Sequence, residues 1–319
     1  MLDRLRHRLS ELILRPQTAP SAYVFALALV PPLVGGILLF KQTAAVLLGL
    51  AVGIGCVAQL PALFLKRFAG GAPLLSSVVA IALVGPNAPL LVVIGLAGGA
   101  AAAELLRARF LPSLRFQVGL AAYAAVVIAT QGAPAAYLRP DAATPMPEPI
   151  RLWLDFYGGS KMPIDITRLY LGNVAGPIFA TSLLAQVLGA AWLWYARRLS
   201  LLTVFGSLIA ATAVTLFFHW APSYQLASGP LWFGLALLLG DRLNLPRNQL
   251  LQLLVGLLGG GAALAVRSRG YAIEGSLVAV ATVQLASAVV SAGTSRLATS
   301  PRPQERLLPP SARSASWKA

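Results

Sequence analysis

Residues 94–102 read IGLAGGAAA, and residues 255–263 read VGLLGGGAA. Each run follows a shorter apolar stretch that is entered at a glycine close to a proline, Gly71 and Gly229 respectively. Each run also ends at arginines and precedes a further apolar run entered near a glycine. The order and spacing of these features match over about sixty residues, which predicts an internal repeat.

The composition fits a membrane protein, because 57% of the 319 residues are apolar and only 11% are charged. A soluble domain of this length would not bury that much apolar surface. Apolar runs of roughly 17 to 25 residues have the length that a helix needs to cross a bilayer. We predict an all-α integral membrane protein of about ten spans, at residues 22–40, 43–65, 69–85, 88–106, 116–131, 172–196, 200–218, 223–240, 248–266 and 275–295.

The repeat divides the spans into five and five, with residues 22–131 as the first repeat and 172–296 as the second. Because five is odd, the second copy crosses the membrane in the opposite sense, which gives an inverted repeat. The third and eighth spans have the shortest apolar cores and occupy corresponding positions. This pairing predicts a site between residues 72–86 and 229–246, with Asp241 as the only nearby carboxylate. The glycines of the fourth and ninth spans predict close helix packing.

The net charge of +15 reflects membrane topology rather than nucleic-acid binding. Most of the 25 Lys and Arg residues fall on one side of the ten-span arrangement, as expected if both termini are cytoplasmic. The same rule places the long loop at 132–171 outside the cytoplasm. Residues 1–21 predict an amphipathic cytoplasmic segment rather than a signal peptide, and residues 297–319 a basic cytoplasmic tail.

Cysteine and histidine are too scarce for most cofactor sites. Cys56 is the only cysteine, so an internal disulfide is excluded and we expect a small buried residue, with a cluster shared with another subunit as the alternative. His7 and His219 are the only histidines, and neither is expected in mid-membrane, which excludes a bis-histidine haem within this chain. Residues 148–157, EPIRLWLDFY, predict a short amphipathic helix at the membrane surface, with Trp153 and Tyr157 as anchors.

Four short motifs carry a family resemblance, clearest over residues 140–290: DAATPM at 141–146, LGNVAGPIFATS at 171–182, GDRLNLP at 240–246 and GYAIEG at 270–275. Together they resemble the D subunit of the Rnf electron-transport complex and the B subunit of Na⁺-pumping NADH:quinone reductase. In that family the threonine of an S-G-A-T-P-like motif carries FMN through a phosphodiester bond. The resemblance therefore implies covalent FMN at Thr144, and it allows a second flavin such as riboflavin between the halves.

The resemblance implies further cofactor-binding positions at Gly172, Asn173, Gly176, Thr181, Ser182 and Asp241. The motif at 171–182 is expected to open the sixth span as a long apolar helix. Phe179 and Ala180 replace the family's Gly-Glu, so a membrane carboxylate is missing and ion pumping through this subunit is in doubt. For Asp241, a solvated ion pair with the adjacent Arg242 is the alternative to a cofactor role.

The function implied is that of a membrane flavoprotein subunit. It would carry electrons through FMN in an Rnf- or Nqr-like redox complex of the bacterial cytoplasmic membrane, with or without ion translocation. Its partners would be other membrane subunits, a flavin transferase and the lipid bilayer. The alternative is a flavin-free transporter or scaffold subunit that kept the fold.

Overall fold

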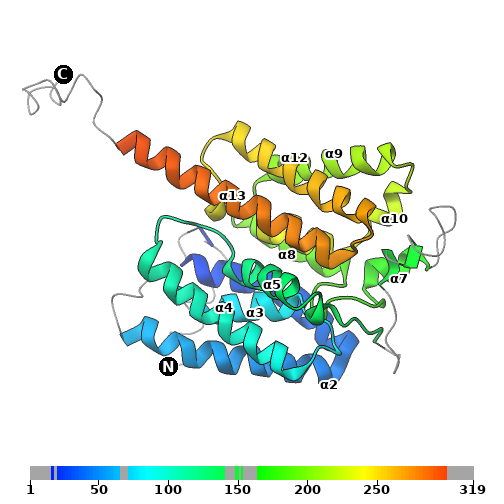
Figure 1. The fold of residues 1–319 in the computed structure, drawn as a ribbon, viewed down its shortest axis with the longest axis horizontal. Coiled ribbons are helices and arrows are strands. Elements are labelled where there is room, and N and C mark those ends of the chain that lie inside the picture. Colours follow the sequence, from blue (N-terminus) through cyan, green and yellow to red (C-terminus); the bar gives the residue numbers. More distant parts are fainter. Residues whose placement is uncertain are drawn as a thin grey trace, which may run out of the picture.

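The computed structural model describes residues 16–17, 20–64, 71–140, 148–150, 152–153 and 164–299. Within these residues the chain is helical, and its only β-bridges are two isolated ones, Leu138 with Gly176 and Leu199 with Asp241. The all-α prediction is confirmed for this part of the chain (Figure 1). The elements are α2 (Ser21–Phe64), α3 (Pro73–Ala82), α4 (Leu90–Phe110), α5 (Val118–Ala129), η2 (Ala133–Ala135), α7 (Ile166–Leu171), α8 (Leu183–Tyr195), α9 (Leu201–Phe217), α10 (Pro222–Leu226), α11 (Gly229–Trp232), η3 (Phe233–Leu239), η4 (Arg242–Asn244), α12 (Gln249–Ala265), η5 (Val266–Arg269) and α13 (Ile273–Thr299).

Four helices in the described residues are long and apolar enough to cross a membrane: Ser21–Pro61, Leu90–Phe110, Gln249–Arg269 and Ile273–Gly293. Five shorter apolar helices accompany them, Pro73–Ala82, Val118–Ala129, Leu183–Tyr195, Leu201–Phe217 and Gly229–Leu239. Each predicted span contains one of these helices or part of one. The number of complete membrane crossings stays a prediction.

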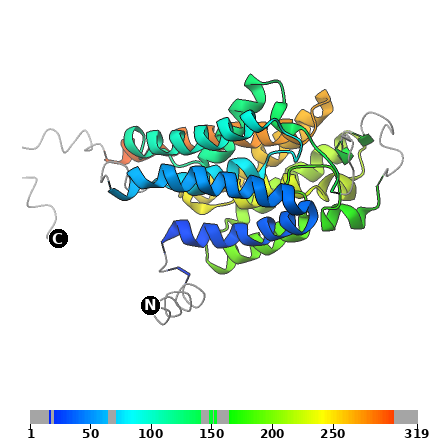
Figure 2. The same cartoon turned by 90° about the horizontal axis from the view of Figure 1, so that it is seen from below.

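Helix α2 contains two antiparallel segments rather than one long rod. Lys41 interrupts it with φ 48° and ψ −120°, and the chain folds back there, as Figure 2 shows in the dark-blue and lighter-blue segments. The sequence predicted separate spans at 22–40 and 43–65, and the turn at Lys41 lies between them. In the same view, the start of α2 and the end of α13 lie at one end of the bundle, and α7 lies at the other.

The two short spans form the interior of their repeats. Helix α3 buries eight of its ten residues, from Pro73 to Ala82, and packs against α2, α4 and α5. Segment η3, a π-helix, buries all seven of its residues and packs against α8, α9, α12 and α13. The shortness predicted from the sequence is confirmed, and each short helix is enclosed mainly by elements of its own half.

The glycine-rich helices α4 and α12 pack differently. A Cβ atom added at Gly256 or Gly260 of α12 would lie 2.2 Å from a carbonyl oxygen of α9, that of Thr203 or Ser207. On α4, a Cβ at Gly95, Gly98 or Gly99 would meet nothing within 4 Å. The prediction of close packing is therefore right for α12 and wrong for α4 within this chain, because α4 buries the opposite face, from Val93 to Glu104.

Two smaller expectations were wrong. Cys56 is exposed on α2 rather than buried, because the adjacent Gly55, and not Cys56, is the residue that packs against Leu74 of α3. The sixth span begins at Leu183 instead of residue 172, because the preceding residues fold as an irregular segment. Most of the predicted N-terminal amphipathic segment at 1–21, residues 1–15 and 18–19, lies outside the described residues, as do residues 300–319 of the predicted basic tail at 297–319.

Candidate functional site

The motif at 171–182 connects two helices and is itself irregular. Gly172 ends α7 in the left-handed conformation, with φ +87°, and a Cβ there would lie 2.6 Å from the backbone nitrogen of Ser182. Glycine is therefore required both by the turn and by the close approach. Ser182 caps α8, because its Oγ accepts the N–H of Ala185 at 3.3 Å and donates to the Tyr170 carbonyl at 3.3 Å. Gly172 and Ser182 thus close the segment into a compact turn.

This segment is attached to the end of α3 and to the long loop. Gly176 forms the antiparallel bridge with Leu138, which lies at the start of the loop. The N–H groups of Ile178 and Phe179 donate to the carbonyls of Val84 and Ala82 at 2.9 and 3.3 Å. The first stem of the long loop is therefore fixed to the junction between the two repeats.

The second stem of the loop is fixed by an aromatic cluster. The Tyr224 hydroxyl donates to the Pro149 carbonyl at 3.2 Å. Trp153 is 1% exposed, with its ring edge-on to Trp220 at a centroid distance of 5.9 Å. Ile150 is fully buried in the same cluster. The prediction that this segment lies at the membrane surface, with Trp153 as an anchor, is thus wrong for Ile150 and Trp153, because residues of the long loop and of the region around α10 cover them.

The other predicted residues of this region have different environments. Thr181 is 2% exposed, and a Cβ at Gly229 would lie 2.2 Å from its carbonyl oxygen. Asn173 has a buried Oδ1 with no hydrogen-bond partner among the described residues. Thr144 lies outside the described residues, between stems at Leu138 and Pro149 that are each tied to the bundle.

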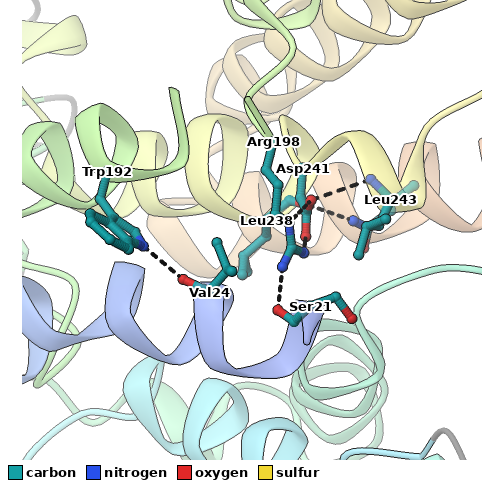
Figure 3. A network of polar contacts seen from close by, with 8 residues as sticks. Ser21, Val24, Trp192, Arg198, Leu238, Asp241 and Leu243 are labelled. Atoms are coloured by element: carbon teal, nitrogen blue, oxygen red, sulfur yellow. Dashed lines mark hydrogen bonds and ion pairs between the residues drawn. The ribbon is translucent and has the colours of Figure 1, made fainter. Parts of the chain in front are cut away.

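Asp241 lies at the other end of α8 from Ser182, so the structure does not bring all the predicted positions into one site. The 13 residues of α8 separate the two ends by about 20 Å at 1.5 Å per residue. The Arg198 guanidinium binds both Asp241 oxygens, through Nε at 3.2 Å and Nη2 at 2.5 Å, and donates to the Ser21 carbonyl (Figure 3).

The predicted alternative for Asp241, a solvated pair with Arg242, is wrong, because the partner is Arg198 and Asp241 is 1% exposed. Burial raises the pKa of the Asp241 carboxyl above its ordinary value, and the Arg198 charge opposes that shift. The pair joins the repeats, because Ser21 begins α2 in the first half while Arg198 and Asp241 belong to the second.

A cavity of about 570 Å³ opens beside this ion pair. Its lining includes Gly71, Ala72 and Ser76 from the start of the third span, and Asp241, Leu243 and Asn244 after the eighth. Residues 72–86 and 229–246, the segments predicted to form a site together, therefore both line this cavity, the first with its beginning and the second with its end.

Asp241 is not the only carboxylate there. Glu104 also lines the cavity, accepts the Ala72 N–H at 3.1 Å and pairs with Arg107 at 2.7 Å. From the sequence, Arg198 was counted only as a topology signal, Arg107 as a topology signal and a marker of the repeat, and Glu104 was not singled out. A carboxylate in a glycine- and alanine-rich span could have indicated it.

Sequence reasoning also missed a buried arginine near the opposite end of α12. Arg267 is fully buried and donates to Gln225 Oε1 at 2.7 Å and Ser276 Oγ at 3.0 Å. Its third nitrogen, Nη2, has no partner in the part of the chain that the structure describes. It links η5, α10 and α13, and α10 also carries Tyr224 of the aromatic cluster. The distribution of charged residues in the sequence assigned Arg267 to one side of the membrane but did not indicate that it is buried.

Comparison with known protein families matches the NQR2, RnfD, RnfE family over residues 15–296. The chain belongs to this family. The match includes both repeats, the long loop and the cavity at Arg198 and Asp241. No curated protein matched the chain. Family membership and the apolar helices together make it a multi-pass membrane subunit of the Rnf and Nqr type of complex.

Proposed function

We propose that this subunit carries electrons through FMN bound covalently to Thr144, within an Rnf- or Nqr-like redox complex of the bacterial cytoplasmic membrane. The family match over 15–296 carries the proposal, because it includes the loop with the A-A-T-P sequence. The fixed loop stems support it. Leu138 bridges to Gly176, and Pro149 accepts the Tyr224 hydroxyl, so the acceptor segment is anchored on both sides.

Two buried polar atoms near the loop stems are consistent with a ligand bound beside them. The Trp153 Nε1 and Asn173 Oδ1 atoms are buried without hydrogen-bond partners in the part of the chain that the structure describes. Such unpaired buried groups are rare and often mark a missing ligand or water. A bound FMN supplies the ability to accept and release electrons, while the protein sets its position and surroundings. The base of the loop would be held by Gly172, Gly176 and Ser182. The Thr181 backbone packs directly against Gly229.

Ion translocation through the 171–182 motif has no support from its side chains. Phe179 is 2% exposed and Ala180 fully buried where the family carries Gly-Glu, so neither supplies a carboxylate. The proposal is therefore electron transfer, and any ion path would use other residues.

The test is co-expression of the full chain with a flavin transferase, followed by denaturing electrophoresis and fluorescence imaging. We expect a fluorescent band for the wild type, none for Thr144→Ala, and an FMN adduct on the peptide from 141 to 151. Thr167→Ala is the matched control, because Thr167 lies in the same loop region but its hydroxyl donates to Asp165 at 3.1 Å. Absence of fluorescence from a well-expressed wild type would refute the proposal and favour the flavin-free scaffold or transporter.

A further inference from the structure

A groove runs along the seam between the two repeats, at the end of the bundle that holds the long loop. It has a volume of about 830 Å³. Val127 and Ile128 of α5 form one wall, Ala262 and Val266 form the other, and Val278 and Val283 of α13 lie between them. In Figure 1, α13 runs between α12 and α5. The lining of the groove is mostly apolar, which suits contact with lipid acyl chains.

One carboxylate stands at the loop end of this apolar groove. Of the described residues that line it, Glu274 alone carries a charge at neutral pH. The neutral polar residues of the lining are Gln131, Tyr271 and Thr282. The Glu274 carboxylate makes no hydrogen bond or ion pair with any residue that the structure describes. Arg267 influences it electrostatically. The Arg267 guanidinium is bonded to Gln225 and Ser276, and its Nη2 has no partner among the described residues.

A carboxylate in such a position needs a cationic or hydrogen-bonding partner, because an unpaired charge beside hydrocarbon is costly. The groove extends from Glu274 to Val283, nine residues of α13, or about 14 Å at 1.5 Å per residue. That length would hold much of an acyl chain, with its polar end beside Glu274. A single negative charge favours a headgroup with an ammonium donor and disfavours an anionic one.

We propose that this groove is a binding site for a phospholipid whose headgroup carries a protonated primary amine, as in phosphatidylethanolamine. The ammonium group pairs with Glu274, and one acyl chain lies along α13 between α5 and α12. The lipid thereby fills the seam where the two repeats meet. This site is independent of the proposed flavin, because it uses none of the residues of the Thr144 loop stems.

The test is native mass spectrometry of the full chain in detergent, titrated with phosphatidylethanolamine, phosphatidylcholine or phosphatidylglycerol of identical acyl chains. We expect phosphatidylethanolamine to be retained about tenfold more than phosphatidylglycerol, a difference of about 1.4 kcal/mol. Glu274→Gln keeps the size of the side chain and should remove this preference. Equal headgroup preference in Glu274→Gln and wild type, or a wild type that favours phosphatidylglycerol, would overturn the proposal.

A second pair of variants tests the acyl-chain position on the same helix. Ala279→Trp places a large side chain in the groove and should reduce retention of all three lipids. Val289→Trp is the control, because Val289 is 61% exposed on α13 and does not line the groove. Equal lipid retention by these two variants would contradict the proposed chain position. If Ala279→Trp fails to fold, the headgroup comparison with Glu274→Gln still decides the proposal.

Discussion

The contact between α9 and α12 predicts that alanine at Gly256 destabilises the protein strongly. The new Cβ would lie 2.2 Å from the Thr203 carbonyl oxygen and 2.9 Å from its carbonyl carbon. Ordinary contacts between nonbonded heavy atoms are about 3.5 Å, so the helices would have to separate by about 1 Å. Glycine at this position is thus a condition for the observed packing.

Separation of the helices would also weaken two hydrogen bonds between them. Thr203 Oγ1 donates to the Gln252 carbonyl at 3.0 Å, and Ser207 Oγ donates to the Gly256 carbonyl at 3.1 Å. Overpacking costs about 1–3 kcal/mol, and each interhelical hydrogen bond in a membrane protein is worth about 0.6 kcal/mol. We expect Gly256→Ala to lower the free energy of unfolding by about 2–4 kcal/mol.

Gly95→Ala is the matched control. It lies in the corresponding glycine-rich run of the first repeat, and an added Cβ there meets nothing within 4 Å. The change should be neutral or slightly stabilising, because alanine favours helix over glycine by up to about 1 kcal/mol. Unfolding of both purified variants in mixed detergent, followed by circular dichroism, gives the comparison. Equal stability of Gly256→Ala and Gly95→Ala would refute the packing difference between the repeats.

Two further predictions concern the buried ion pair and the topology. Because burial raises the folded-state pKa of Asp241 above its ordinary value of 3.8, the folded state binds the proton more tightly and stability falls as the pH rises through that folded-state pKa. Arg198→Gln removes the opposing charge, so we expect the free energy of unfolding to fall by about 3–5 kcal/mol at neutral pH. This loss should shrink on acidification toward about pH 4, where Asp241 becomes protonated. Unfolding measured at several pH values tests this, and a pH-independent loss would contradict it. Reporter fusions at Ala136 and Ser316 should give opposite signals, since the charge pattern places the first outside and the second inside; matching signals would refute the ten-span arrangement.

Sequence patterns predicted the helical segments well, but were less successful with the surfaces that these segments present. The weak third and eighth spans are short in the structure, because α3 has ten residues and the segment after Gly229 changes to a π-helix. The burial of Trp153 was not predictable from its helical spacing. The same amphipathic pattern suits a membrane surface or a protein surface, and only the positions of Trp220 and Tyr224 distinguish them.

The candidate site was predicted in its segments and only in part in its residues. Residues near 72 and 241 were expected to meet, and both line the cavity of about 570 Å³. Glu104 was missed, since its role depends on the Ala72 N–H, 32 residues earlier in the chain. For the 171–182 motif, the family resemblance identified the segment, while its irregular conformation follows from the αL turn at Gly172 and the cap at Ser182.

The sequence by itself determined that this chain is a helical membrane protein of the NQR2, RnfD, RnfE family. In lipid, the backbone N–H and C=O groups of a long apolar run can form hydrogen bonds only within a helix. Local composition is therefore sufficient to predict a helical membrane protein. Only the tertiary structure decided which glycine faces are filled, and that Asp241 pairs with Arg198, 43 residues earlier, instead of its neighbour Arg242. Both outcomes depend on how helices that are distant in the chain approach one another. A buried charge is stable only beside a suitable partner, and a glycine surface is filled only where another helix packs against it.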